Sequence, residues 1–160
     1  MANLTLRACK YRDLDRVVAL EKASFPDSPY RKSDFFSFLF SARKGFKLAW
    51  EYDSLVGYVI AKRRKEGDGL IQSMVVAPEF RRRGFGVALL MSAMNHLAVQ
   101  YQRAYLFVDE KNESAIHLYH KVSFKETGNV VKRYYPNGDD AIEMMRVLGD
   151  VQDSTANEMV

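Results

Sequence analysis

The chain has 160 residues, of which 48% are hydrophobic and 28% are charged. This length and balance suit one globular domain that buries its own core, and they exclude a disordered chain. The net charge is +4, but the last twelve residues hold three acids and no base, so the first 148 residues carry +7. A basic domain attracts polyanions, which include both nucleic acids and phosphorylated cofactors.

The sequence also limits where the protein works. No apolar run reaches the roughly 18 residues of a membrane-spanning helix, and the N-terminus has no signal-peptide core. The single cysteine, Cys9, cannot form an internal disulfide, so we expect a reducing, cytoplasmic setting without a membrane partner. We expect Cys9 to be a small buried residue of the first strand, because no base that could activate its thiol stands out in the sequence.

The first forty residues predict a strand, a helix, a loop and a second helix. Period-two alternation predicts the strand over residues 4–9, and apolar residues at helical spacing predict a helix from Leu14 that ends before Phe25. Two prolines in residues 25–30 restrict the backbone and predict an irregular loop. An aromatic-rich helix then begins at about Lys32.

A meander of three strands follows. Residues 46–52 and 55–63 predict two strands joined by a tight turn at residues 53–54, and residues 69–77 predict a third that ends at Pro78. The next elements are a long helix, a short apolar strand, a helix that follows Asn112, and two closing strands; their predicted ranges are 87–100, 104–108, 112–121, 124–134 and 141–148.

Mostly antiparallel strands around one strand–loop–helix crossover predict a mixed α/β or α+β domain. We assign residues 1–148 to this single domain and residues 149–160 to a polar tail that lacks hydrophobic periodicity.

The most informative stretch is the glycine-containing loop between the third meander strand and the long helix. Glycine lets the backbone approach a ligand closely, and free N–H groups at a helix N-terminus bind anions. Gly84 and Gly86 stand at this point, directly after three arginines. The loop lacks the lysine of a nucleoside-triphosphate loop and the three glycines of a dinucleotide fingerprint, so it favours a diphosphate without a metal. A basic solvated loop with a glycine turn is the alternative.

Two motifs in this half resemble the GNAT acetyltransferase superfamily. Arg81-x-x-Gly84-x-Gly86 after Val-Val-Ala-Pro is similar to its acetyl-CoA loop, and residues 108–124 are similar to its second motif, N-x-x-A-I-x-L-Y-x-K-x-G-F. Ser123 replaces the last glycine of that motif. The resemblance implies a mixed, mostly antiparallel twisted sheet of six to seven strands with about four helices and splayed central strands. It also implies an N-acetyltransferase that uses acetyl-CoA and no metal.

Two further stretches, residues 25–30 and 134–141, resemble N-terminal acetyltransferases of the arrest-defective and ribosomal-alanine types. In those enzymes the two loops frame a peptide N-terminus, and some of them work at the ribosome or with an auxiliary subunit. The acceptor residues implied here are Phe25, Pro26, Asp27, Pro29, Tyr30, Tyr134 and Tyr135. Core packing is the alternative role for the aromatic ones.

The resemblance also implies which residues hold the cofactor. In the superfamily, the splayed fourth strand supplies backbone groups to the pantetheine arm, and the glycine loop holds the diphosphate. Asn112 is expected to contact the cofactor arm, and it is also a good helix N-cap. The implied set is Met74, Val75, Val76, Arg81, Arg82, Arg83, Gly84, Phe85, Gly86, Val87, Asn112 and Tyr119.

For the chemistry, Tyr119 is the candidate general acid, because a phenol stays protonated at pH 7 and can donate to a leaving thiolate. The general base is open. Relatives carry a histidine or a glutamate where this chain has Leu70 and Phe107, so neither base is carried over. Asp27, which could equally be a turn or cap residue, and Gln72, which could hold a water, are the remaining candidates. We interpret the three histidines, at positions 96, 117 and 120, as surface residues of helices.

Without an obvious strong base, the acceptor matters. A peptide α-amine with a pKa near 7.8 is about 10–15% neutral at pH 7, whereas a lysine amine is only about 0.04% neutral. A protein or peptide N-terminus is therefore the preferred acceptor. A lysine side chain or a small polyamine is the alternative acceptor, and a basic nucleic-acid module without a recognised motif is the alternative from another class.

Overall fold

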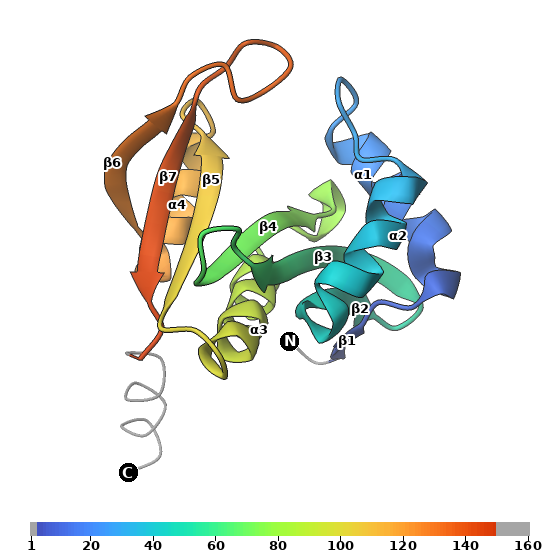
Figure 1. Ribbon diagram of the computed structural model, residues 1–160. Helices are drawn as coiled ribbons and strands as arrows, with labels where there is room; N and C mark the ends of the chain where they lie inside the picture. The colour runs from blue at the N-terminus through green and yellow to red at the C-terminus, as the bar shows by residue number, and fades with distance from the viewer. Residues whose placement is uncertain (1–2, 150–160) are drawn as a thin grey trace.

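The computed structural model describes residues 3–149, which form one seven-stranded sheet with four α-helices (Figure 1). The helices are α1 (Leu14–Ser24), α2 (Lys32–Ser41), α3 (Phe85–Ala98) and α4 (Glu113–Lys121). The strands are β1 (Leu4–Ala8), β2 (Phe46–Glu51), β3 (Ser54–Arg63), β4 (Gly69–Val76), β5 (Arg103–Asp109), β6 (Lys125–Val131) and β7 (Ala141–Val147). Residues 150–160 of the predicted tail lie outside the described residues.

The predicted mixed, mostly antiparallel sheet is confirmed. The strand order is β1-β2-β3-β4-β5-β7-β6, and β4 with β5 is the parallel pair among the described strands. None of the helices within residues 3–149 is long and apolar enough to cross a membrane.

Two predicted elements had boundaries that were wrong by two or more residues. Helix α3 begins at Phe85 rather than at residue 87, because Gly84 takes a left-handed conformation (φ 85°) and lets the helix start at once. Strand β6 ends at Val131 rather than at residue 134. There Arg133 has a positive φ of 51°, and its backbone N–H donates to the side chain of Asp140, which turns the chain into a loop. Tyr134 therefore lies in that loop and not in a strand.

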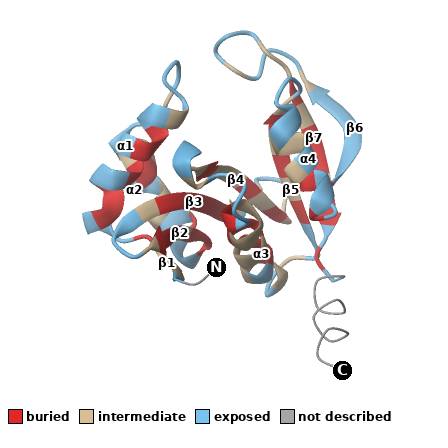
Figure 2. Cartoon of the chain, turned by 180° about the vertical axis from the view of Figure 1, so that it is seen from behind, coloured by how far each residue is buried: buried red, intermediate tan, exposed pale blue. Residues whose placement is uncertain are grey.

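Two hydrophobic clusters lie on opposite faces of the sheet. One joins α3 and α4 to β3, β5 and β7, and includes Leu90, Met94 and Phe124. The other joins α1 and α2 to β2 and β3, and includes Leu14, Phe35 and Tyr58. Figure 2 shows β3 and much of β7 buried, whereas the edge strand β6 is exposed.

The central strands, β4 and β5, pair at their N-terminal ends and then diverge. Strands β4 and β5 pair in parallel at Gly69–Ala104, Leu70–Tyr105 and Ile71–Leu106, and no further pairing follows between them. Beyond Ile71, β4 stays paired with β3, and β5 stays paired with β7. The predicted splay of the central strands is thus confirmed, and it opens the sheet at its middle.

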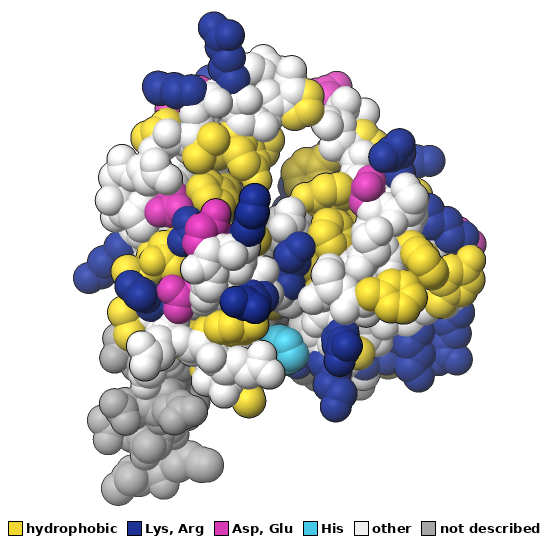
Figure 3. Space-filling view, viewed as in Figure 1, with side chains coloured by type: hydrophobic (Ala, Val, Ile, Leu, Met, Phe, Trp, Pro, Cys, Tyr) yellow, Lys and Arg dark blue, Asp and Glu magenta, His cyan; other side chains and the backbone are white. Residues whose placement is uncertain are grey.

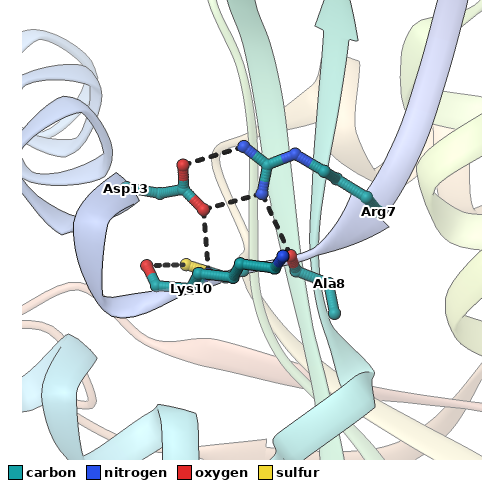
Figure 4. Close-up of polar contacts among 5 residues, drawn as sticks. Arg7, Ala8, Lys10 and Asp13 are labelled. Atoms are coloured by element: carbon teal, nitrogen blue, oxygen red, sulfur yellow. Dashed lines mark hydrogen bonds and ion pairs between the residues drawn. The ribbon is translucent and has the colours of Figure 1, made fainter.

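The N-terminal strand is joined to the start of α1 by a half-buried ion pair between Arg7 and Asp13 (Figure 4). The Asp13 carboxylate accepts hydrogen bonds from Nη1 and Nη2 of Arg7, at 2.7 and 2.8 Å, and from the backbone N–H of Lys10 at 2.9 Å. These bonds from Arg7 hold the pKa of Asp13 below its usual range. Cys9 beside them is buried as predicted, and burial raises its pKa to about 12, so its thiol stays protonated.

We predict that Asp13→Asn lowers the free energy of unfolding by about 1–3 kcal/mol at pH 7, because charge-assisted bonds to a buried carboxylate are lost. A lowered folded pKa stabilises the fold above the unfolded value near 3.9, and this stabilisation is lost as the pH falls through the folded pKa. Urea unfolding at pH 7 and at about pH 3 measures this effect. The difference in the free energy of unfolding between wild type and variant should be smaller at the lower pH.

The matched control is Asp15→Asn, which removes an exposed ion pair between Asp15 and Lys32. It should change stability by less than about 1 kcal/mol. An equal loss in the free energy of unfolding for both variants would contradict the structural role of Asp13.

Candidate active site

The opening between β4 and β5 is the candidate site. Figure 3 shows a hollow between the two halves of the molecule, with hydrophobic side chains on its walls. The loop between α1 and α2 (residues 25–31) and the loop between β6 and β7 (residues 132–140) lie at the same end of the molecule, on either side of it (Figure 1). Since β5 does not pair with residues 72–76 of β4, some backbone N–H and C=O groups of this stretch face the opening.

Gln72 lies at a β-bulge in β4, and the bulge sets the direction of its side chain. Ser73 is opposite Ile60 and Ile71 is opposite Ala61, so Gln72 is the extra residue of a bulge. Bulges redirect side chains. Here the Gln72 side-chain amide donates to the Tyr30 hydroxyl at 3.0 Å, which joins two residues that the sequence singled out.

Tyr30 is held firmly by its surroundings. Its ring packs edge-on against Phe35 and Phe38 of α2, with centroids 5.7 and 5.3 Å away. Its backbone N–H donates to the carboxylate of Glu21 at 3.0 Å. Burial is the main cause that raises the pKa of Tyr30. Ring packing and this hydrogen bond therefore hold the α1–α2 loop in place at Tyr30.

Glu21 is a functional candidate that sequence reasoning missed. It is 2% exposed, and its second carboxylate oxygen accepts a hydrogen bond from the Tyr58 hydroxyl at 2.6 Å. The same hydroxyl lies 2.9 Å from the hydroxyl of Ser73. In the sequence Glu21 looks like one polar residue of an amphipathic helix, and nothing local indicates that a strand 37 residues away meets it.

The opposite wall comes from the β6–β7 loop. Tyr134 stacks on Phe107 of β5, with centroids 5.6 Å apart and planes 18° apart, and meets Tyr135 edge-on. Phe107, noted above only as the residue that replaces a base, is thus the support of this wall. Side-chain ion pairs fix the loop at Asp139 with Lys111 (2.6 Å) and at Asp140 with Lys132 (2.8 Å).

Tyr119 of α4 is buried, and burial raises its pKa to about 12. Its hydroxyl makes no hydrogen bond to another described residue. The pKa of Tyr135 is raised by burial first and also by Tyr134, Asp109, Tyr119 and Tyr30. Four tyrosines from three separate segments therefore lie near one region, at the mouth of the opening.

The predicted anion site at the start of α3 has the expected backbone. The first turn of a helix leaves N–H groups without intrahelical partners, and those of Phe85, Gly86 and Val87 bond to no other described group. The Phe85 side chain is buried against Phe80 and serves the core.

Gly86 has a packing role beside any role in ligand binding. A Cβ at this position would lie 3.2 Å from the Leu118 side chain of α4 and within 4 Å of Met74 and Val76. A larger side chain would require the Leu118 side chain to move. A charged residue here would therefore disturb the fold as well as a bound ligand.

The three arginines beside this helix start differ from one another. Arg83 is committed to Glu51 of β2 through two hydrogen bonds, at 2.5 and 3.1 Å, and Arg81 donates to the backbone carbonyl of Val76 at 3.0 Å. Arg82 is exposed and makes no ion pair within residues 3–149. Arg82 is thus the arginine of this loop that could bind a ligand without breaking a bond to another of the described residues.

The remaining predicted residues divide by environment. Val75 is buried toward α1 and α2, whereas Met74 and Val76 pack toward α3. Asn112 is the N-cap of α4, and its side-chain oxygen accepts from the backbone N–H of Ala115 at 3.1 Å. In the α1–α2 loop, Pro29 is partly buried, and the exposed predicted residues are Phe25, Pro26 and Asp27.

Other surface features lie away from the opening. His117 and His120 are exposed, as predicted, but His96 is partly buried at a hollow of about 550 Å³ that Lys44 and Lys62 also line. A second hollow of about 450 Å³ lies around Trp50. No group of three or more His, Cys, Asp or Glu side chains in the described part of the chain could hold a metal ion.

Comparison with known proteins finds similar sequences and a similar fold. Residues 12–124 match the model of the acetyltransferase (GNAT) family. The N-alpha-acetyltransferase of Saccharolobus solfataricus is 30% identical over 91% of this chain and 94% of its own length. The spermidine N(1)-acetyltransferase of Escherichia coli is 31% identical, but over 44% of this chain and 40% of its own length. The crystal structure of Ard1 from Thermoplasma volcanium superposes with a TM-score of 0.85 at 23% identity, over 91% of this chain and 98% of that chain.

Proposed function

Because the chain belongs to the acetyltransferase (GNAT) family and is an N-acetyltransferase that uses acetyl-CoA, we propose that its acceptor is the α-amino group of a protein or peptide N-terminus. The observation that carries this proposal is the arrangement at the opening, where tyrosines of the α1–α2 and β6–β7 loops face Gln72 and Tyr119. The relative that matches nearly end to end is an N-alpha-acetyltransferase, whereas the spermidine enzyme matches less than half of the chain.

The chain has the groups that acetyl-CoA requires. The free N–H groups of Phe85, Gly86 and Val87 fit a diphosphate at a helix N-terminus, and Arg82 adds an unpaired positive charge. The edge of β4 at Met74, Val75 and Val76 offers backbone groups to the pantetheine arm and the acetyl carbonyl. Asn112 and Tyr119 of the α4 segment would border that arm. When bound, acetyl-CoA supplies a thioester carbonyl for attack and a thiolate that leaves.

The acceptor wall suits an uncharged or weakly basic amine. Its described members are mainly aromatic or proline, with Asp27 as the exposed acid among them; they are Phe25, Pro26, Asp27, Pro29, Tyr30, Tyr134 and Tyr135. A polyamine carries several charges, and a site for it would need several acids. A lysine amine would also reach the site almost fully protonated, whereas an α-amine does not.

Each candidate group has a role that follows from its environment. Tyr119 keeps its proton, because burial raises its pKa to about 12, and can donate it to the leaving thiolate. Gln72 is fixed by its bond to Tyr30 and can orient a water or the amine. Asp27, exposed at the loop tip, would contact the acceptor rather than a buried partner.

The setting of the reaction belongs to the same proposal. We expect a cytoplasmic enzyme whose acceptors are presented at the ribosome or with an auxiliary subunit. We also expect residues 1–148 to be the catalytic domain and residues 149–160 to be a tail that turnover does not need.

Acetyl transfer to a panel of short peptides tests the function directly. The peptides differ in their first residue, and the controls are a peptide with a blocked N-terminus and one lysine, and spermidine. We expect mass spectrometry to find acetyl on free α-amines, with kcat/KM at least about tenfold above either control, a factor that corresponds to about 1.4 kcal/mol in transition-state binding. A preference for the blocked lysine peptide or for spermidine would contradict the proposal.

We predict that Tyr134→Ala raises the peptide KM about tenfold or more and leaves the KM for acetyl-CoA nearly unchanged, because the stacked ring belongs to the acceptor wall. Steady-state kinetics with each substrate varied in turn measures this. Tyr52→Ala, which removes an exposed ring on the β2–β3 turn, is the matched control. An equal change in both KM values would show that Tyr134 only supports packing.

We predict that Tyr119→Phe lowers kcat by about 10²-fold and leaves the peptide KM unchanged, because the hydroxyl acts on charge that appears only in the transition state. The melting temperature should hardly change, since the hydroxyl bonds to no other described group. Tyr105→Phe, on β5 beneath Arg64, is the control with the same substitution. A kcat within threefold of wild type would remove Tyr119 from the mechanism.

A further inference from the structure

We propose that Ser73, Tyr58 and Glu21 form a proton relay that carries a proton from the acceptor ammonium into the protein, with Glu21 as the final acceptor. The proposal rests on the proposed function, because it concerns the amine that binds at this opening. It supplies the general base that neither Leu70 nor Phe107 can provide.

The three side chains form a continuous path through the sheet face that α1 covers. The Ser73 and Tyr58 hydroxyl oxygens are 2.9 Å apart, and the Tyr58 hydroxyl donates to Glu21 at 2.6 Å. Both distances are typical of good O–H···O bonds. Tyr58 is fully buried and Glu21 is 2% exposed, so the inner part of the path is sealed from water.

The outer end of the path reaches the site. Ser73 is partly exposed, and it follows Gln72 in the stretch of β4 that β5 has left. The neighbouring Gln72 side chain bonds to the Tyr30 hydroxyl in the acceptor wall. A second oxygen of Glu21 holds the backbone N–H of Tyr30. The relay and the acceptor wall are therefore parts of one bonded unit.

The direction of the hydrogen bonds allows transfer inward. Ionised Glu21 only accepts, so Tyr58 donates to it, and the Tyr58 oxygen is left to accept from Ser73. When an ammonium N–H bond breaks and its proton reaches the Ser73 oxygen, directly or through a water, the Ser73 proton passes to Tyr58 and the Tyr58 proton passes to Glu21. The products are a neutral amine and a neutral carboxylic acid, and neither hydroxyl gains or loses a proton overall.

The charges around Glu21 favour this role. Burial raises its pKa, although the bonds from Tyr58 and Tyr30 oppose the rise, so its proton affinity moves toward that of an α-amine. The titratable groups that face it are Tyr58 from β3 and Tyr30 from the loop, and no cation pairs with it in the described chain. Burial raises the pKa of Tyr58 well above its usual value, so it relays a proton without becoming a tyrosinate.

The test compares pH profiles of kcat/KM for peptide acetylation. Glu21→Gln is the central variant, because its amide can still accept from Tyr30 and bond to Tyr58, but cannot take up a proton. Below the amine pKa of about 7.8, we expect a loss of about tenfold or more that shrinks to less than about threefold near pH 9, where bulk water has already deprotonated the amine.

Two other variants break the relay at different points. Ser73→Ala removes its outer end and Tyr58→Phe its middle, and both should show the same loss at low pH. Ser37→Ala, which removes an exposed hydroxyl on α2, is the matched control and should keep the wild-type profile. Infrared difference spectra of the enzyme without acetyl-CoA give a readout besides activity, since protonation of Glu21 should yield a carboxylic acid band that Glu21→Gln lacks.

The outcomes separate the relay from the proposed function. If the wild type does not acetylate α-amines, the proposed function fails. If it does, but Glu21→Gln loses the same factor at every pH or loses nothing, the relay is wrong and Glu21 only holds Tyr30 in place. A low-pH loss in Asp27→Asn, without one in Glu21→Gln, would assign the base to Asp27 instead.

Discussion

The divergence of β4 and β5 is the constraint on which the rest of this structure depends. Two parallel strands that paired along their full length would satisfy each other's backbone groups and leave no opening. Here the pairing stops after Ile71 and Leu106, and each strand is then held from its other side, β4 by β3 and β5 by β7. Helix α3 packs across the base of the opening, against both β3 and β5. The splay is therefore fixed by packing on both sides.

Under the proposed function, each side of the splay serves a different partner. The start of α3 and the edge of β4 present backbone N–H and C=O groups, which suit the phosphate and amide groups of acetyl-CoA. The α1–α2 and β6–β7 loops present rings, which suit a peptide. Gln72 and Ser73 occupy the boundary between these two surfaces, and the bulge at Gln72 turns its side chain to the acceptor side. The chemistry must take place where the two surfaces meet.

Local patterns in the sequence predicted the elements and the phosphate loop, because helix periodicity, glycines and arginines are read within one segment. Relations between segments could not be predicted in this way. The pairing of Arg83 with Glu51 crosses 32 residues, and the bond of Tyr58 to Glu21 crosses 37. Phe107 supports Tyr134 only because the sheet brings β5 beneath the β6–β7 loop. Sequence reasoning consequently named the walls of the site and missed the residues that hold them.

The location of a base matters as much as its presence. A carboxylate about 4 Å from the acceptor would stabilise the ammonium by about 4 kcal/mol at an effective dielectric constant of 20, and this attraction opposes the deprotonation that the reaction requires. Doubling that distance halves the attraction. Two intervening hydroxyls place Glu21 farther from the amine while keeping a path for the proton, and the stacked rings of Phe107 and Tyr134 add no negative charge beside the amine. A buried acid reached through neutral groups can thus accept the proton without holding the amine in its unreactive form.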